Sequence, residues 1–118
     1  MADEDDAIDS AALARLERLG GKTLLRQMIA LFLENAPQRL NAATQGAAAG
    51  DARGVERAAH SVKSMAANVG ARRLQRLAEA LEAGIAGGTV DDLATRTREL
   101  VDEMERVRNR LEHHAGGP

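Results

Sequence analysis

The sequence predicts an all-α protein, folded as an antiparallel four-helix bundle with a short additional N-terminal helix. Alanine, leucine and arginine, which favour helices, are abundant among the 118 residues, whereas aromatic residues make up only 1% of them. Apolar residues recur at spacings of three and four through four long segments, which is typical of amphipathic helices. Glycines stand between these segments, where helices commonly end. Short turns of this kind join antiparallel neighbours in a bundle.

The N-terminal end is expected to contribute the short additional helix. Residues 1–7 are predicted to form a disordered, acidic N-terminus. Asp9 or Ser10 can cap the helix that follows, and Gly20 and Gly21 would end it. The apolar residues of this helix are Leu13, Leu16 and Leu19.

Residues 22–49 are predicted to form one long helix. Pro37 lies inside the segment and removes the backbone hydrogen bond to Leu33, so we expect a kink there. Because the apolar stripe keeps its phase across Pro37, one bent helix is favoured over two separate helices. The stripe consists of Leu25, Ile29, Phe32, Ala36, Leu40, Ala43 and Ala47.

Two shorter helices are expected next, over residues 52–69 and 71–86. Gly50 would end the long helix, Asp51 would cap the first of the two, and Gly70 would separate them. Their apolar stripes are Val55, Ala59, Val62, Ala66 and Val69 in the first, and Leu74, Leu77, Leu81 and Ile85 in the second.

A last helix is expected after Gly87 and Gly88. Thr89 is predicted to cap it, with Asp92 three residues later in a variant of the capping box. Residues 113–118 are predicted to be a frayed C-terminal tail, so the folded domain would span residues 8–112. The apolar seam of the last helix consists of Leu93, Thr97, Leu100, Met104, Val107 and Leu111.

Composition excludes several classes of function. Without cysteine the chain has no disulfide, thiolate chemistry or common structural zinc site, and the adjacent His113 and His114 point about 100° apart on a helix, which is poor for metal binding. The net charge of −2, with arginines interleaved among acids, gives no electrostatic footprint for nucleic acid. No apolar run approaches the roughly 20 residues of a membrane span, and no signal peptide is visible. We therefore expect a cytoplasmic protein without a metal site.

The stretch HSVKSMAANVG, residues 60–70, carries the residues best suited to chemistry. His60 lies about 100° off the apolar seam, and Lys63, Ser64 and Ala67 follow at spacings that place them on the same face. An imidazole nitrogen is a competent nucleophile near neutral pH. A lysine one turn away, on its flexible side chain, could place its ammonium next to the negative charge of a phosphoryl group. The small Ser64 and Ala67 would leave room for a partner protein. From these residues alone, an ordinary solvated helix face remains an open alternative.

The longer stretch AAHSVKSMAANVGARRLQRLAEALE resembles the core of the histidine-containing phosphotransfer (HPt) domain of bacterial and plant phosphorelays. The His-x-x-Lys pattern and the glycine ten positions after the histidine are met by His60, Lys63 and Gly70. The resemblance extends in pattern over residues 8–112, although only 60–70 form a specific motif. Ser64 stands where the family usually has glycine, a change between small residues.

The resemblance implies a role for each residue of the site. His60 would accept the phosphoryl group, and Lys63 would stabilise its charge. Glu82 falls where related domains often have a Glu or Gln that touches the imidazole, so it would orient His60; the alternative is an exposed acid paired with Arg72 or Arg76. Ser64 and Ala67 would face the partner. Gly70 would take a left-handed conformation and let the helices on either side of it meet closely.

The resemblance also implies partners. A sensor or hybrid histidine kinase, or a phospho-aspartyl receiver, would supply the phosphoryl group, and a response-regulator receiver domain would take it. The receiver would bring Mg²⁺, and this chain, expected to be a monomer, would need no cofactor of its own. The chain holds no Gly-rich nucleotide loop, so it would be a phosphotransfer intermediate and not an ATP-dependent kinase. The alternatives are a helical adaptor that binds a signalling partner without carrying phosphate, and a domain excised from a larger kinase.

Overall fold

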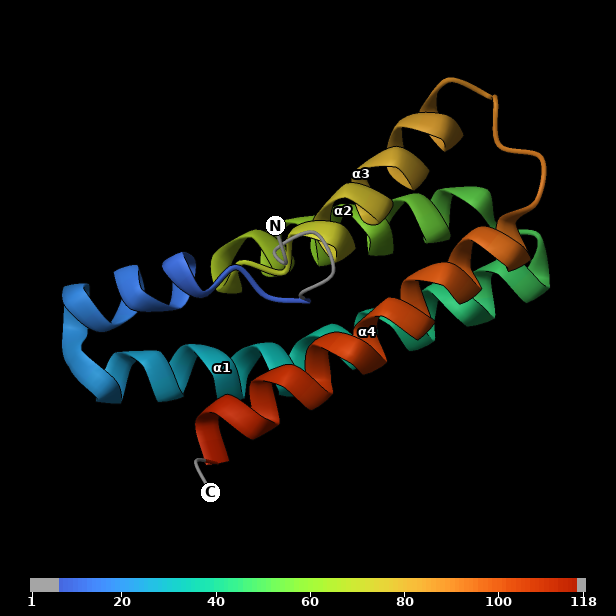
Figure 1. Ribbon diagram of the computed structural model, residues 1–118. Coiled ribbons are helices and arrows are strands. Elements are labelled where there is room, and N and C mark those ends of the chain that lie inside the picture. Colours follow the sequence, from blue (N-terminus) through green and yellow to red (C-terminus); the bar gives the residue numbers. More distant parts are fainter. Residues whose placement is uncertain (1–6, 117–118) are drawn as a thin grey trace.

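The computed structural model describes residues 7–116 and shows an all-α chain in which successive helices run in opposite directions (Figure 1). The four helices are α1 (Ser10–Ala49), α2 (Ala52–Val69), α3 (Arg72–Ala86) and α4 (Leu93–Gly116). Helices α1 and α2 pack against each other along their lengths, α3 packs on α2, and α4 closes the bundle against α1 and α3. The predicted fold class of four packed helices is confirmed.

The N-terminal part of α1 differs from the expectation of a separate short helix. The backbone leaves helical geometry at Gly20 (φ −145°, ψ 19°) and Gly21 (φ 75°, ψ −174°), and the chain changes direction there (Figure 1). The predicted end at Gly20 and Gly21 coincides with this break, but no loop residue separates the two helical segments, so residues 10–19 form the first arm of α1. Leu19, one of the three apolar residues expected on this helix, is 79% exposed, whereas Leu13 is buried.

The second arm of α1 follows the prediction of a single helix. A kink was expected at Pro37, but the backbone keeps helical dihedral angles there, and the departures from helical geometry within α1 are at Gly20 and Gly21. It ends at Gly50, which has a φ of 73° and donates its N–H to carbonyls of the last turn. Asp51 then caps α2 by accepting a hydrogen bond of 2.9 Å from the N–H of Gly54. Both predicted boundaries are confirmed.

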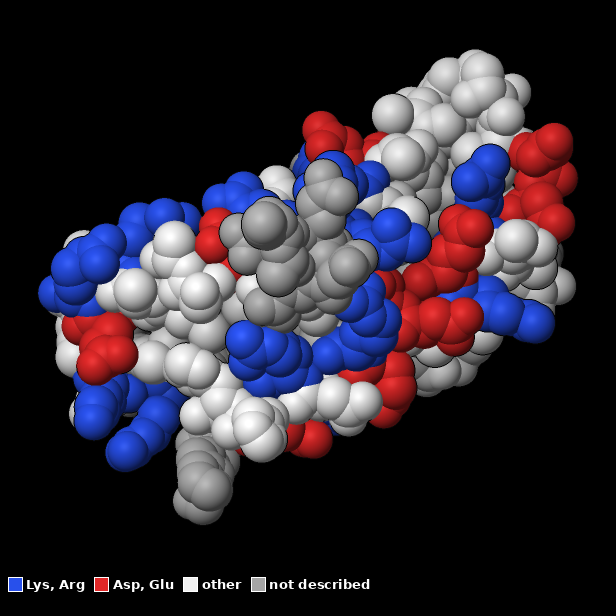
Figure 2. Space-filling view, viewed as in Figure 1, with Lys and Arg blue, Asp and Glu red and all other residues white. Residues whose placement is uncertain are grey.

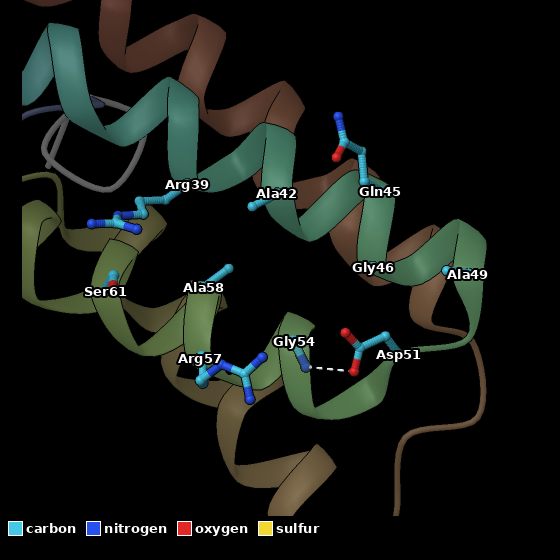
Figure 3. Close-up of a pocket in the computed structure, with 10 residues that line it drawn as sticks. All are labelled: Arg39, Ala42, Gln45, Gly46, Ala49, Asp51, Gly54, Arg57, Ala58 and Ser61. Atoms are coloured by element: carbon cyan, nitrogen blue, oxygen red, sulfur yellow. Dashed lines mark hydrogen bonds between the residues drawn. The ribbon is translucent and has the colours of Figure 1, made fainter.

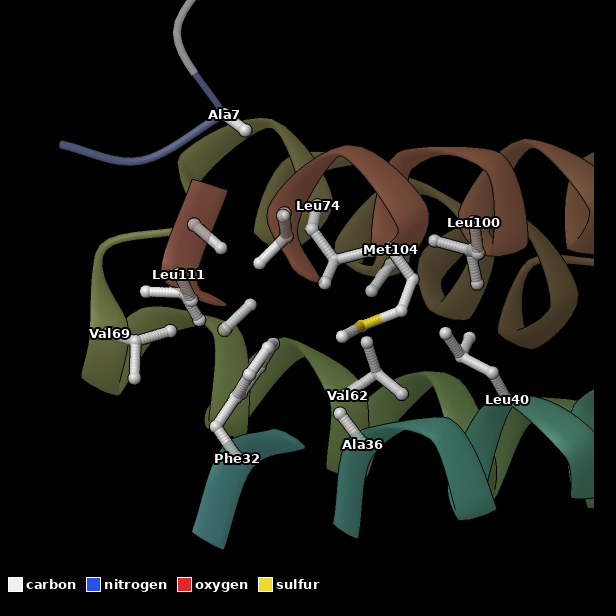
Figure 4. Packing of buried hydrophobic residues seen from close by; sticks show 14 of the residues in the cluster. Ala7, Phe32, Ala36, Leu40, Val62, Val69, Leu74, Leu100, Met104 and Leu111 are labelled. Atoms are coloured by element: carbon white, nitrogen blue, oxygen red, sulfur yellow. The ribbon is translucent and has the colours of Figure 1, made fainter. Parts of the chain in front are cut away.

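The core is filled by apolar side chains from all four helices (Figure 4). The predicted stripes supply most of it, and their alanines allow the helices to approach closely. Ala7 and Ile8 are 5% and 2% exposed and also belong to this core, so residue 7 departs from the predicted disordered N-terminus, while residues 1–6 lie outside the described part of the chain. Core residues in Figure 4 include Phe32, Ala36, Leu40, Val62, Val69, Leu74, Leu100, Met104 and Leu111.

The two ends of α4 also differ from the sequence prediction. Asp92, and not Thr89, caps the helix: its carboxylate accepts hydrogen bonds from the N–H of Thr95 (3.0 Å) and from the Thr95 hydroxyl (2.7 Å). The hydroxyl of Thr89 instead donates to the carbonyl of Gly84 at 3.2 Å, which closes the end of α3. At the other end α4 runs to Gly116, so His113 and His114 are helical; residues 117–118 of the predicted tail lie outside the described residues.

A buried acid ties α4 to α3. Glu103 of α4 is 4% exposed, and its Oε1 lies 3.3 Å from Nε of Arg73 on α3 and 2.9 Å from a guanidinium nitrogen of Arg106. Because a buried carboxylate is costly unless it is paired, this contact favours one placement of α3 against α4. Helix α3 also carries Glu82, a residue of the predicted site.

The surface of the bundle is polar and mixed in charge. On the face seen in Figure 2, acidic and basic side chains are interspersed along α4. Within residues 7–116, every helix is too short or too polar to cross a lipid bilayer.

Candidate functional site

His60 projects from the outer face of α2. Its neighbours Ala59 and Val62 are fully buried, and the helical turn therefore directs the His60 side chain outward, where 61% of it is exposed. The burial of Ala59 and Val62 and the exposure of His60 both follow from the sequence, because the apolar seam of α2 determines which face of the helix is buried. The imidazole is thus held on a rigid helix and is accessible to another protein.

Glu82 reaches His60 from α3. Its Oε2 lies 2.7 Å from Nδ1 of His60, a short hydrogen bond between side chains. Leu81, next to it in the chain, is buried, so Glu82 stands at the edge of the face that α3 packs on α2. Of the two predicted surroundings for Glu82, the structure shows the imidazole contact; Arg72 pairs instead with Asp9, at 2.7 Å.

Lys63 binds the other oxygen of the same carboxylate. Its Nζ lies 2.8 Å from Oε1 of Glu82, one helical turn beyond His60. Glu82 therefore bridges His60 and Lys63, and the three side chains form one hydrogen-bonded cluster at the surface between α2 and α3. In this state the lysine, predicted to serve the phosphoryl group, is engaged by Glu82.

The electrostatics of the cluster keep Glu82 ionised. The hydrogen bond from Lys63, and secondarily that from His60, lowers the pKa of Glu82 below its ordinary value, against the opposing effect of partial burial. The same hydrogen bond raises the pKa of Lys63. At neutral pH the carboxylate and the ammonium are therefore both charged.

An ionised Glu82 determines which nitrogen of His60 is free. A carboxylate can only accept hydrogen bonds, so Nδ1 must carry the proton that joins it to Glu82. In the neutral imidazole this leaves the lone pair on Nε2, the nitrogen that does not contact Glu82. The arrangement therefore leaves Nε2 as the nitrogen that is able to act as a nucleophile.

The remaining predicted residues line the same part of α2. Ser64 and Ala67 are exposed and small, on the face that carries His60. Gly70 ends the helix with a φ of 74°, the left-handed conformation that was predicted. Its closest neighbours differ from the prediction, because a Cβ on Gly70 would lie 2.6 Å from Cβ of Ala12 and 2.9 Å from the carbonyl of Asp9; the start of α1, and not α3, approaches Gly70 most closely.

An open groove of about 550 Å³ between α1 and α2 adjoins the site (Figure 3). Arg39 of α1 and Arg57 and Ser61 of α2 line it. Neither arginine belongs to the site predicted from the sequence, although Arg57 stands three residues before His60, a spacing that places the two on one face. Within residues 7–116, His, Asp and Glu side chains do not gather in groups of three or more that could hold a metal ion.

Comparison with known proteins identifies a family and a related fold. The sequence model of the Hpt domain matches residues 27–110, a segment that contains His60, Lys63, Gly70 and Glu82. The crystal structure of histidine-containing phosphotransfer protein B (HptB) from Pseudomonas aeruginosa PAO1 superposes with a TM-score of 0.86, at 23% sequence identity over 93% of this chain and 95% of that one. This likeness shows a common fold. No curated protein sequence matches the chain.

Proposed function

The chain belongs to the Hpt domain family, and from this premise we propose that it carries phosphoryl groups on His60 within a two-component phosphorelay. The family implies histidine phosphotransfer by an intermediate and not by a kinase. The observation that supports His60 as the acceptor is its geometry: the imidazole is 61% exposed, and Glu82 binds Nδ1 at 2.7 Å, which leaves Nε2 free. The donor would be the phospho-aspartate of a receiver or hybrid histidine kinase, and the final acceptor a response-regulator receiver domain.

The transfer step follows from this geometry. Nε2 of His60 attacks the phosphorus of an aspartyl phosphate, a nitrogen–phosphorus bond forms, and the aspartate leaves with the electron pair of the broken phosphorus–oxygen bond. Because Nδ1 keeps its proton, the imidazole ring gains positive charge during the attack. The Glu82 carboxylate, 2.7 Å away, stabilises that charge. In the next transfer the aspartate of a second receiver attacks the phosphorus, and the ring returns to its neutral form.

Lys63 would stabilise the phosphoryl group itself. A phosphoryl group adds about two negative charges near neutral pH, and the Lys63 ammonium lies one turn from His60 on a flexible stem. Moving from Glu82 toward the phosphoryl oxygens would place its charge where the transition state needs it. The Mg²⁺ of the reaction would belong to the receiver, so this chain would need no cofactor of its own. The proposal also places it in the cytoplasm, as a monomer, together with the domains it serves.

The test is transfer from a phosphorylated receiver. Receiver domains of the source organism are loaded with radiolabelled phosphate and mixed with the protein, and labelled chain is isolated. We expect label that is lost in acid and retained in alkali, as for a phosphoramidate. The His60→Gln variant should take no label. Label that survives in this variant, on Ser61 or Ser64 for example, would contradict the assignment, and receiver binding without any transfer would favour the adaptor.

A further inference from the structure

The groove between α1 and α2 contains two positively charged side chains that have no role in the proposed transfer reaction. Arg39 enters it from α1 and Arg57 from α2, and both side chains are exposed (Figure 3). Within the described part of the chain neither guanidinium forms an ion pair. Two unpaired cations therefore face one open space that can admit several side chains of a partner.

The acidic residue of the groove does not cancel this charge at the end near His60. Among the ten lining residues Asp51 is the one acid, and it accepts a hydrogen bond of 2.9 Å from the Gly54 N–H at the start of α2. In Figure 3 Asp51 lies at the end of the groove away from Ser61, and Arg39 lies near Ser61. The end near Ser61, the residue next to His60, thus carries the positive charge of Arg39.

The positive charge lies on one side of His60. Arg57 precedes His60 by three residues and shares its face of α2, and Ser61, adjacent to His60, lines the groove. On the other side, toward α3, the positive charge of Lys63 is paired with Glu82 at 2.8 Å. A protein that docks over His60 therefore meets the unpaired charges of Arg39 and Arg57 on the side toward α1.

We propose that Arg39 and Arg57 bind an acidic segment of the receiver domain, next to its phosphorylated aspartate, and so determine which receivers dock productively. This inference rests on the proposed function, which requires a receiver to bring a phosphoryl group and acidic metal ligands to His60. Charges at the rim of an interface mainly raise the association rate and exclude partners of like charge. The two arginines act in partner choice, and the chemistry stays with the cluster of His60, Lys63 and Glu82.

The experiment measures association rates of receiver domains in stopped flow. Arg39→Glu, Arg57→Glu and the double variant are compared with Arg98→Glu, a matched control because Arg98 is an exposed arginine on α4. At low ionic strength the double variant should associate about tenfold more slowly than wild type, and the difference should shrink as salt is added. The rate of transfer within the formed complex should stay close to wild type. A loss no larger than that of Arg98→Glu would overturn the proposal.

A second measurement separates this inference from the proposed function. The same substitutions are placed in the His60→Gln background, which cannot carry phosphate, and only binding is followed. If wild type takes no label but receivers still bind in a salt-dependent way through Arg39 and Arg57, the docking surface stands and the phosphocarrier assignment fails. If wild type takes label and the arginine variants associate normally, the docking surface fails alone. Absence of receiver binding to any variant contradicts both.

Discussion

Glu82 holds His60 by Nδ1 at 2.7 Å, although 22 residues separate the two along the chain. The contact exists because α2 and α3 form an antiparallel pair around Gly70, and because each residue stands at the edge of its helix's buried face. Orientation of the His60 imidazole is therefore a property of helix packing. Changes to Glu82 should alter chemistry without altering the fold.

Two substitutions of Glu82 should distinguish the effect of its hydrogen bond on the transfer rate from the effect of its negative charge. Glu82→Gln keeps an oxygen that accepts from Nδ1 and should retain part of the transfer rate. Glu82→Ala removes the acceptor, so the proton of His60 can occupy either nitrogen, and we expect transfer to slow by about tenfold or more. Nitrogen-15 NMR of the imidazole reports the tautomer directly. Equal rates in wild type and Glu82→Ala would show that the contact does not assist transfer.

Lys63→Met should slow transfer by about tenfold or more while receiver affinity stays near wild type, because the ammonium matters most when phosphoryl charge is shared between two groups. The same change removes the strongest cause of the low Glu82 pKa, which should therefore rise toward its ordinary value of 4.5. Carboxyl carbon-13 shifts against pH measure that rise. Lys63→Arg, which keeps the charge, is the control; a loss of affinity with an unchanged transfer rate would make Lys63 a docking residue.

Asp9 should make stability depend on pH at acid values. Hydrogen bonds from Arg72 and from the Ala11 N–H lower the pKa of Asp9 below its ordinary 3.8. A depressed folded-state pKa contributes stability that is fully present above the unfolded value and is lost as pH falls through the folded one. Asp9→Asn, which can still cap the helix, should therefore melt below wild type at neutral pH and match it in strong acid. A constant difference in Tm across this range would contradict the assignment.

Gly70 and Gly50 should respond differently to alanine. Both have φ near 74°, where an L side chain costs about 1–2 kcal/mol. A Cβ on Gly50 meets no atom within 4 Å, whereas on Gly70 it would lie 2.6 Å from Cβ of Ala12. Gly50→Ala should therefore show the backbone cost alone, and Gly70→Ala a clearly larger loss of unfolding free energy in denaturant melts. Equal losses would mean that the start of α1 moves aside freely.

Helix ends could be predicted where local chemistry fixes them. A glycine ends a helix through its own backbone conformation, and a capping side chain binds an N–H three residues away, so neither depends on distant contacts. The predicted helix ends at Gly50 and Gly70 and the predicted cap at Asp51 are confirmed. The capping prediction at Thr89 was wrong because two acceptable caps, Thr89 and Asp92, lie three residues apart, and packing of the α3–α4 turn selects Asp92.

Contacts between helices could not be predicted from periodicity. The position of Glu82 after Leu81 placed it at the edge of the buried face of its helix, but an arginine and the imidazole remained equally good candidates for its partner. Which of them it contacts depends on how α3 is rotated against α2. Burial of Ala7 and of Glu103 was missed for the same reason: each depends on a neighbour distant in sequence. The functional motif could be found because His60, Lys63 and Gly70 lie within a single helix and its cap.

His60→Gln should abolish phosphoryl acceptance and leave the fold intact. The side chain is 61% exposed and lies off the core, and a surface change of this kind alters stability by less than about 0.5 kcal/mol. The glutamine amide can still donate to Glu82, so the cluster loses its nucleophile but keeps a hydrogen-bond donor. Circular dichroism, thermal melting and receiver binding should match wild type.

Signalling in cells then distinguishes the phosphocarrier from the adaptor. An adaptor needs only the surface of the bundle, and that surface survives His60→Gln, so its output should persist at normal protein levels. A phosphocarrier needs the nucleophilic Nε2, which glutamine lacks, so its output should disappear even though receivers still bind. Lys63→Arg is the matched control, because it keeps both the imidazole and the positive charge and should retain partial output. Normal signalling by His60→Gln would place the protein in the adaptor class.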